Sequence, residues 1–371
     1  MDRRISALIN PDVMRIEPYK PGKPIEELQR EKGLERIVKL ASNENPIGSS
    51  PLAAAALKEL SGRLNRYPDG YGFELKKALS DLWRIPPEML VLGNGSSEII
   101  EMMVRLFVGP GKKVVLASPS FSIYELTTIA QGGEAVHVQL KDHTADLPAV
   151  ARAVDGKTAL VILGNPNNPT GTIFGRTAWE KFLAEIPPTV PVLLDEAYAE
   201  YSDDPAMFDG RDYVSGDRPV IAARTFSKAH GLAALRLGYA IAPEEIVDAM
   251  NRLRLPFNAN AAAQAAAAAS LSDGDFLRRS VEVNRTGRER LQIFFASRGV
   301  PYIKSQANYV SARVGDGDRF FALMLDEGVI IRSIRGFGMP EWVRVTVGLD
   351  EELAIFEAAF DKVKGIMEAG E

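Results

Sequence analysis

The sequence contains no cysteine and only three histidines among its 371 residues. Without cysteine the chain can form neither a disulfide bond nor a thiolate metal site. The histidines are His137, His143 and His230, and their spacing matches no common metal-binding pattern. We therefore expect no metal site.

The sequence also lacks an excess of positive charge and long apolar runs. It has 44 lysines and arginines against 49 aspartates and glutamates, a formal net charge of -5, which predicts no basic surface for nucleic acid. No apolar run approaches the roughly 18 residues needed to span a bilayer, and the N-terminus has no apolar segment typical of a signal peptide. We therefore expect a cytoplasmic protein without nucleic-acid or membrane partners.

Short apolar runs alternate with helical patterns from about residue 86 onward. Several runs are apolar throughout, as expected of strands that are buried on both faces of a mainly parallel sheet. The pattern predicts a large doubly wound α/β domain with seven strands. The predicted strands are Val91–Leu92, Val114–Ala117, Ala135–Val138, Ala159–Leu163, Val192–Leu194, Val220–Ala223 and Leu237–Ala242. The alanine-rich segment Ala259–Ala269 is predicted to be a helix packed closely against a neighbour.

The pattern changes after about residue 275, where long helices and short strands predict a smaller α+β domain. Its predicted strands are Asn308–Ala312, Val329–Arg332 and Val343–Val347. Residues 1–41 are rich in proline and charge, which indicates an extended arm that we assign to the smaller domain. The predicted division is the arm at 1–41, the large domain at 42–274 and the small domain at 275–371.

The segment Arg224–Tyr239 carries the most specific chemical signal. It places Lys228 after a buried apolar run and close to the hydroxyls of Thr225 and Ser227. Arg236 follows eight residues after the lysine. A lysine can form a Schiff base with an aldehyde, and hydroxyls with a guanidinium can bind a phosphate. An aldehyde and a phosphate on one small molecule describe pyridoxal 5′-phosphate; a solvated loop lysine is the alternative.

Further polar groups stand at the ends of predicted strands. Asp195 follows an apolar strand, and a buried carboxylate there needs a cationic partner such as a pyridinium nitrogen; a helix N-cap is the alternative. Asn168 lies in the rigid turn Gly164–Gly171 at the end of another strand. Tyr198 follows Asp195 by three residues and could return its hydroxyl to the same pocket.

Two more segments offer cofactor contacts. Gly93–Glu98 follows a strand and opens a helix predicted over Ile99–Phe107. Its exposed amides, with the hydroxyls of Ser96 and Ser97, could cradle a phosphate, although a simple N-cap is more common. The aromatic residues of Pro119–Tyr124 could stack on a planar ring or belong to the core.

The order of these motifs resembles the class I/II pyridoxal-phosphate aminotransferases and, within that class, most closely the histidinol-phosphate aminotransferases. The closer resemblance rests on S-N-E-N-P-I-G (42–48), R-Y-P-D (66–69), G-N-G-S-S-E (93–98), N-P-N-N-P-T-G (165–171), D-E-A-Y (195–198), T-F-S-K-A-H-G-L-A-A-L-R-L-G-Y (225–239), L-P-F-N (255–258) and V-R-V-T-V-G (343–348). The chain departs from the family at Ser97, often Asp, at Ala234, often Gly, and at His230, usually apolar.

The resemblance implies an aspartate aminotransferase-like fold and a role for each site residue. Lys228 would hold pyridoxal 5′-phosphate and move the substrate proton. Asp195 would keep the ring nitrogen protonated, and Tyr198 with Asn168 would bind the ring hydroxyl. The remaining implied cofactor-binding residues are Gly95, Ser96, Ser97, Thr225, Ser227 and Arg236 around the phosphate, Tyr124 stacked on the ring, and Tyr67 from the other subunit. That last role implies a homodimer with shared active sites.

Two arginines point to the substrate. Arg332 ends one predicted strand and Arg344 lies within another. Since arginine is rarely buried unpaired, the two suggest a shared anionic ligand. The alternative is a pair of structural salt bridges with the local carboxylates Asp326, Glu327 or Glu341. By resemblance, Arg344 would bind a carboxylate or the phosphate ester. The resemblance also implies that Arg332, Tyr19 and Asn43 contact the substrate.

The implied reaction is transamination of L-histidinol phosphate with 2-oxoglutarate, which gives imidazole-acetol phosphate and glutamate in histidine biosynthesis. An aromatic amino-acid aminotransferase and an amino-acid-phosphate decarboxylase of the same family are the enzymatic alternatives. A regulator built on the same fold is the non-enzymatic one. It is disfavoured because 1–41 is too short and too rich in proline for a DNA-binding module, and because Lys228, Asp195 and Arg236 occur together.

Overall fold

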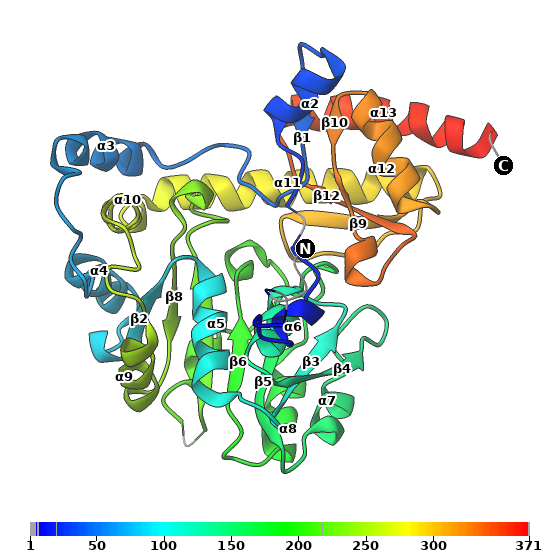
Figure 1. The fold of residues 1–371 in the computed structure, drawn as a ribbon. Helices are drawn as coiled ribbons and strands as arrows, with labels where there is room; N and C mark the ends of the chain where they lie inside the picture. Colours follow the sequence, from blue (N-terminus) through cyan, green and yellow to red (C-terminus); the bar gives the residue numbers. More distant parts are fainter. Residues whose placement is uncertain (1–4, 6, 20, 217, 370–371) are drawn as a thin grey trace.

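The computed structural model of the chain describes residues 5, 7–19, 21–216 and 218–369. A large sheet with its helices forms one part of the molecule, and a smaller part with two short sheets packs against it (Figure 1). No helix in these described ranges is long and apolar enough to cross a membrane.

A seven-stranded sheet forms the centre of the larger part, with the strand order β2-β8-β7-β6-β5-β3-β4. Its strands are β2 (Leu90–Gly93), β3 (Lys113–Ser118), β4 (Glu134–Gln139), β5 (Thr158–Gly164), β6 (Val192–Asp195), β7 (Val220–Thr225) and β8 (Gly238–Ile241). Only β8 runs antiparallel to its neighbours β2 and β7. The prediction of a mainly parallel, seven-stranded α/β sheet is therefore confirmed.

The central strands are apolar throughout because helices cover both faces of the sheet. Ile162, Leu193 and Ile221 pack into the core under α5 (Ser96–Phe107), α6 (Ile123–Ala130) and α9 (Glu244–Leu253). The alternate residues Val161, Val192 and Val220 pack into the core under α7 (Leu147–Ala153) and α8 (Arg176–Glu185). Since side chains alternate along a strand, each strand fills both cores.

Three helices cover the edge of the sheet near β2 and β8. They are α3 (Pro51–Leu60), α4 (Phe73–Trp83) and α10 (Ala261–Leu271). The small side chains of Ala53 on α3 and Ala263 on α10 share one core, so α10 packs closely as its alanine content predicted. The helix begins two residues later than predicted, at the Asn260 cap, whose side chain accepts a hydrogen bond from the Ala263 amide at 2.8 Å.

The smaller part contains a three-stranded antiparallel sheet of order β11-β12-β9 and a two-stranded parallel sheet of β1 and β10. The elements are β1 (Val38–Lys39), α11 (Gly274–Ser297), β9 (Tyr309–Arg313), α12 (Gly317–Asp326), β10 (Val329–Ile330), β11 (Arg332–Ser333), β12 (Trp342–Thr346) and α13 (Asp350–Ala369). The prediction of one strand over Val329–Arg332 is wrong. The chain leaves the first sheet after Ile330, and Arg332 pairs in the second sheet with Arg344.

The N-terminal arm contacts both parts: its 3₁₀ helix η1 (Val13–Arg15) packs against α6 of the larger part, and its later residues pack on the smaller part. Helix α2 (Ile25–Lys32) interrupts the predicted extended arm, and its Leu28 shares a small core with Ala41 and Ile330. The domain boundaries at 41/42 and 274/275 stay predictions. The remaining short 3₁₀ helices are η2 (Ser61–Arg63), η3 (Pro87–Met89), η4 (Ala199–Tyr201), η5 (Gly210–Tyr213), η6 (Ala233–Leu235) and η7 (Arg335–Phe337).

Candidate active site

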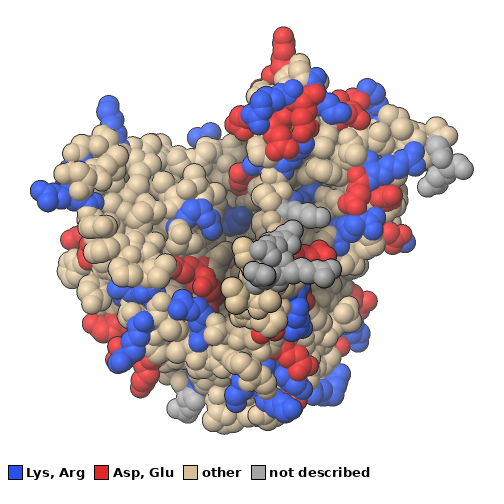
Figure 2. Space-filling view, viewed as in Figure 1, with Lys and Arg blue, Asp and Glu red and all other residues tan. Residues whose placement is uncertain are grey.

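A cavity of about 210 Å³ is lined by residues of the sheet, the arm and the smaller part. The molecular surface is hollowed where the two parts meet, and basic side chains are visible in the hollow (Figure 2). Of the sixteen predicted site residues, all but Gly95 and Tyr67 line this cavity. Strands β5, β6 and β7 end at its floor, as expected for a ligand site in an open α/β sheet.

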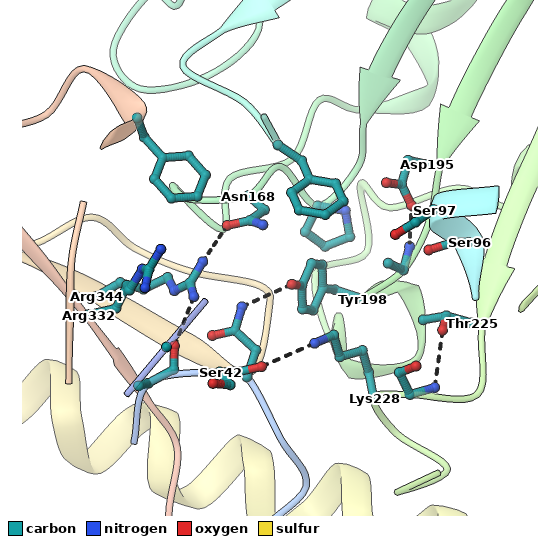
Figure 3. A pocket seen from close by; sticks show the side chains of 18 of the residues that line it. Ser42, Ser96, Ser97, Asn168, Asp195, Tyr198, Thr225, Lys228, Arg332 and Arg344 are labelled. Atoms are coloured by element: carbon teal, nitrogen blue, oxygen red, sulfur yellow. Dashed lines mark hydrogen bonds between the residues drawn. The ribbon is translucent and has the colours of Figure 1, made fainter. Parts of the chain in front are cut away.

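The predicted residues form two groups at opposite ends of the cavity, and each group contains side chains or amides that could bind an anion. Figure 3 shows Arg332 and Arg344 on one side and Asp195, Ser96 and Ser97 on the other. Lys228 and Tyr198 lie between the two groups (Figure 3). A molecule held at both ends would therefore place its middle beside the lysine.

Lys228 follows strand β7 and its amine faces the cavity. Nζ donates a hydrogen bond to the carbonyl of Ser42 at 3.3 Å and lies 5.6 Å from the centre of the Tyr198 ring. Burial lowers the pKa of Lys228 from 10.5 to about 7, and the charges of Arg344 and Arg236 add to this lowering. The amine is therefore available as a nucleophile near neutral pH.

Asp195 ends strand β6 and is 5% exposed. Its Oδ2 accepts a hydrogen bond from the Tyr124 hydroxyl at 2.7 Å, and its Oδ1 accepts one from the Ala197 amide at 3.1 Å. Burial raises the pKa of Asp195, whereas these hydrogen bonds and the Lys228 charge oppose that rise. In the described part of the chain no cation forms an ion pair with this carboxyl, so it is suited to a cationic ligand group.

Tyr124 makes a contact that was not predicted, while its predicted stacking on the ring stays a prediction. Its ring is 2% exposed and its hydroxyl is bonded to Asp195, which fits a role in orienting the carboxyl. Phe121 packs edge-on against it, with ring centroids 5.8 Å apart, and also lines the cavity. Phe121 is thus a second candidate for stacking on a ring. Both aromatic residues lie in the segment Pro119–Tyr124, so the sequence contained the signal but did not distinguish them.

A cradle for an anion lies at the start of helix α5. The helix begins at Ser96, three residues earlier than predicted, and no side chain caps it. Its first amides are therefore free to bind an anion. An added Cβ at Gly95 would lie 2.5 Å from Arg236 Nη2, and one at Gly238 would lie 2.4 Å from the Ser96 amide. Only glycine at both positions lets these donors converge.

Ser227 and Arg236 complete this end of the cavity. Arg236 Nη1 donates to Ser227 Oγ at 3.3 Å. The hydroxyl of Thr225 donates to the Leu237 carbonyl at 3.2 Å and accepts from the Ser227 amide at 3.1 Å, so it shapes the loop that carries Ser227 and Lys228. The donor set suits a phosphate, whose charge the guanidinium and the helix amides would share.

The other end of the cavity carries two adjacent arginines. Arg332 and Arg344 are register partners across β11 and β12. Arg344 Nη1 donates to Asn168 Oδ1 at 2.6 Å, and Nη2 donates to the Ala41 carbonyl at 3.0 Å. Its Nε is buried and has no hydrogen-bond partner among the residues that the structure describes, and its guanidinium lies 5.1 Å from the centre of the Tyr309 ring.

The charge of Arg344 affects its neighbour Arg332. Burial lowers the pKa of Arg332, the positive charge of Arg344 adds to that lowering, and the nearby Tyr19 opposes it. Arg344 forms no ion pair with any carboxylate of the described residues. The carboxylates considered as structural partners, Asp326, Glu327 and Glu341, pair with Lys32, Lys362 and Arg313. A ligand anion is therefore a better explanation for Arg344 than a salt bridge with one of these carboxylates.

Seven lining residues were not among the predicted site residues: Gly22, Ala41, Ser42, Phe121, Pro166, Ala197 and Phe337. The Ser42 carbonyl accepts from Lys228, and its signal lay in the motif at 42–48. Phe337 lies 5.9 Å from the Arg344 guanidinium, and its position after a short irregular segment gave no sequence signal. Within the described ranges no group of three or more metal-ligating side chains could hold a metal ion.

Tyr67 lies outside this cavity. It is 82% exposed and stacks on Phe257, with ring centroids 4.5 Å apart and planes at 15°. Within one chain it cannot contact the groups described above, since it does not line the cavity. Any role in the site therefore requires a second copy of the chain.

The groups that line the cavity fit the three functional groups of pyridoxal 5′-phosphate. A phosphate fits the cradle of Ser96 and Arg236, which a Cβ at Gly95 would fill. A nucleophilic amine fits the aldehyde, and a buried carboxyl without an ion pair fits the ring nitrogen.

Comparison with known proteins agrees with this arrangement. Residues 35–356 match the family model for aminotransferase class I and II. The histidinol-phosphate aminotransferase 1 of Cupriavidus pinatubonensis is 47% identical over 359 residues, which cover 95% of this chain and 96% of the relative.

Solved structures agree as well. The crystal structure of the histidinol-phosphate aminotransferase of Sinorhizobium meliloti with pyridoxal-5′-phosphate is 28% identical, with a TM-score of 0.88 over 96% of this chain and 97% of that chain. An aspartate aminotransferase of Thermus thermophilus, at 21% identity, shares the fold, with a TM-score of 0.82 over 96% of this chain and 99% of that chain. The predicted fold is thus confirmed. The chain belongs to the class I and II aminotransferases and, within them, to the histidinol-phosphate aminotransferases.

Proposed function

We propose that the protein transfers the amino group of L-histidinol phosphate to 2-oxoglutarate and forms imidazole-acetol phosphate and glutamate, a reaction of histidine biosynthesis. The observation that carries this proposal is the pair Arg332 and Arg344, placed side by side at the end of the cavity opposite the phosphate cradle. The names of the relatives support the same substrate. The cytoplasmic location stays a prediction from the sequence.

Pyridoxal 5′-phosphate, the cofactor of this family, would supply an electron-accepting ring and an aldehyde. Lys228 would hold the aldehyde and Asp195 the ring nitrogen. Asn168 and Tyr198 would bind the ring hydroxyl, and Phe121 or Tyr124 would cover the ring. The phosphate would be held by the α5 amides of Ser96 and Ser97, next to Gly95, and by Thr225, Ser227 and Arg236.

The residues of the chain would perform three tasks. The amine of Lys228, with its pKa lowered to about 7, would remove a proton from the substrate α-carbon and return it at the end of the transfer. Asp195, buried at the end of β6, would keep a positive charge at the ring nitrogen. The guanidinium of Arg344, stacked near Tyr309, would orient the substrate through its anionic end.

The arginine end suits a phosphate ester. A phosphate monoester carries nearly two negative charges near neutral pH, which two adjacent guanidinium groups can share. Tyr19, which lines the same end, would add a hydroxyl donor. In the second half of the reaction the same end must accept a carboxylate of glutamate, so both donors compete for one site and the kinetics should be ping-pong.

The donor preference provides the test of this function. Purified holoenzyme should be assayed with L-histidinol phosphate, phenylalanine, tyrosine and aspartate as amino donors and 2-oxoglutarate as acceptor. We expect the highest kcat/KM with histidinol phosphate. A preference for phenylalanine would assign the protein to the aromatic aminotransferases, and release of carbon dioxide from a phosphorylated amino acid would assign it to the decarboxylases.

The two arginines should differ in their effect on the donors. Arg332→Ala should lower kcat/KM for histidinol phosphate by about 10²-fold and for glutamate by less than about 10-fold, because only the phosphate needs a second charged donor. Arg344→Ala should lower both by about 10²-fold or more. Arg335→Ala is the matched control, since this arginine is half-exposed and pairs with Asp316 and Asp318. Equal losses for both donors in Arg332→Ala would refute a phosphate-specific role.

We also propose that two copies of the chain form a dimer with shared active sites. An exposed apolar patch supports this proposal, since such patches mark protein interfaces. Its members are Leu64, Tyr67, Tyr71, Phe73, Leu255 and Phe257, which are 42–82% exposed. The stacking of Tyr67 on Phe257 and the hydrogen bond from Arg254 to the Gly70 carbonyl at 2.6 Å join the two segments into one surface.

Tyr67→Phe should weaken cofactor binding by about 10-fold, because one hydrogen bond to a charged phosphate would be lost. Equilibrium dialysis of the apoprotein measures the effect, and Tyr71→Phe, which removes a hydroxyl from the same patch, should not show it. Mixed dimers of Tyr67→Phe chains with Lys228→Ala chains should contain one intact site each. A monomer with full cofactor affinity would contradict the shared site.

A further inference from the structure

Three consecutive residues of the segment 41–43 each contact a different residue of the proposed site. The Ala41 carbonyl accepts from Arg344 Nη2 at 3.0 Å, and the Ser42 carbonyl accepts from Lys228 Nζ at 3.3 Å. The side chain of Asn43 donates from Nδ2 to the Tyr198 hydroxyl at 2.9 Å. The segment thus connects the arginine end of the cavity, the lysine and the tyrosine.

Asn43 is held firmly in an uncommon backbone conformation. It is 1% exposed and has a φ of 55°, a left-handed value that asparagine adopts more readily than most non-glycine residues. The Asn308 side chain donates to its carbonyl at 3.0 Å, and its own amide donates to Thr346 Oγ1 at 3.0 Å. Contacts from the smaller part therefore fix its backbone.

The orientation of the Asn43 side-chain amide follows from these contacts. Because Thr346 Oγ1 accepts from the Asn43 backbone amide, its own proton can be donated to Asn43 Oδ1, at 3.1 Å. The nitrogen of the side chain must then face Tyr198. Asn43 was predicted to bind substrate; in the structure both of its polar side-chain atoms are bonded to the protein.

This orientation decides what the Tyr198 hydroxyl can do. Its oxygen accepts the Asn43 proton, so its own proton must point elsewhere. Among the residues that the structure describes, none accepts that proton, and Tyr198 lines the cavity. Burial raises the pKa of Tyr198, so the hydroxyl stays protonated. The proton is therefore available to a ligand.

We propose that Asn43 is a positioning residue that directs the Tyr198 hydroxyl proton into the cavity, toward the ring hydroxyl oxygen of the bound cofactor. This inference rests on the cofactor site of the proposed function but not on the identity of the amino donor. Thr346 and Arg344 lie two residues apart on β12 and therefore on one face. The strand that orients Asn43 thus also carries the arginine that would bind the substrate.

The bound cofactor offers a readout that does not depend on turnover. A hydrogen bond donated to the ring oxygen stabilises its negative charge and weakens the hold of that oxygen on the proton of the lysine linkage. Loss of the bond should raise the pH at which the absorption of the bound cofactor changes. The other titratable or charged groups near Tyr198 are Asp195, Lys228, Arg344, Tyr19, Tyr124, Tyr201 and Tyr309.

The experiment is a double-mutant cycle on holoenzymes without substrate, followed by absorbance against pH. Asn43→Gly removes the donor and suits the positive φ, so it should raise the midpoint by about one pH unit, as should Tyr198→Phe. Adding Asn43→Gly to Tyr198→Phe should cause no further change, because Asn43 acts only through the hydroxyl. A midpoint that is unchanged in Asn43→Gly, or that shifts equally in both backgrounds, would overturn the inference.

A second variant covers the case in which Asn43→Gly does not fold. Thr346→Val keeps Asn43 but removes the hydroxyl that fixes its side-chain amide, so the midpoint should rise by a smaller amount; no rise would overturn the proposal. Different outcomes would contradict the proposed function. If the wild-type protein shows no cofactor absorption, the cofactor site is wrong, and if another amino donor is preferred, the substrate is wrong while the midpoint test still stands.

Discussion

Lys228→Ala should abolish covalent attachment of the cofactor and lower kcat by about 10⁴-fold or more, because both the attachment point and the base that moves the substrate proton are lost. Borohydride reduction followed by peptide mapping should place the cofactor on Lys228 in the wild-type protein and on no residue in the variant. Attachment to a different lysine would remove the basis of the whole site assignment.

The same lysine should affect the stability of the apoprotein. Its pKa is about 7 in the folded chain and 10.5 ordinarily, so the unfolded chain binds more protons between these pH values. Stability of the wild-type apoprotein should therefore rise as the pH increases from 7 to 10.5. At pH 7 the Lys228→Met apoprotein should be more stable than the wild-type apoprotein, by about 1.4 kcal/mol for each pH unit between the folded and the ordinary pKa of Lys228. This difference in stability should vanish above pH 10.5. Urea denaturation at several pH values measures it.

Asp195→Asn should retain the cofactor and still lose most of the activity. An amide at this position cannot hold a positive charge at the ring nitrogen, so kcat should fall by about 10²–10³-fold. Cofactor content should change little, since other residues, Ser96, Ser227 and Arg236, would hold the phosphate.

Tyr124→Phe is the matched control for Asp195→Asn. It removes the hydrogen bond to Oδ2, at 2.7 Å, but leaves the carboxylate in place. Its effect on kcat should therefore be smaller, about 10-fold or less. A kcat near the wild-type value in Asp195→Asn would show that the carboxylate serves the fold alone.

The parts of the site that were predictable from sequence are those that depend on local patterns. Asp195 and Lys228 each follow a fully apolar run, and such a run predicts a buried strand whose end faces the ligand site. Arg344 was predictable for the opposite reason, because a charged residue within an apolar strand needs a partner. For each of these residues, the pattern within about ten neighbouring positions was enough to predict its chemical role.

Contacts between distant segments were not predictable in this way. The hydrogen bond from Tyr124 to Asp195 joins residues 71 positions apart, and the one from Thr346 to Asn43 joins residues 303 apart. Nothing in the local pattern at Val329–Arg332 shows that the arm strand β1 pairs with β10 and so splits that run between two sheets. The sequence also did not show whether Asp326, Glu327 or Glu341 pairs with the two arginines. In the structure these carboxylates pair instead with Lys32, Lys362 and Arg313 from other elements.

The two ends of the cavity present different kinds of donor group, backbone amides with side chains at one end and arginine side chains at the other. The phosphate cradle depends on backbone amides and on the missing side chains of Gly95 and Gly238, where a Cβ would collide with donors. The opposite end depends on side chains of β11 and β12 in the smaller part. The arginine end can therefore be altered one side chain at a time without moving the backbone, whereas a side chain at either glycine would displace the donors of the cradle themselves.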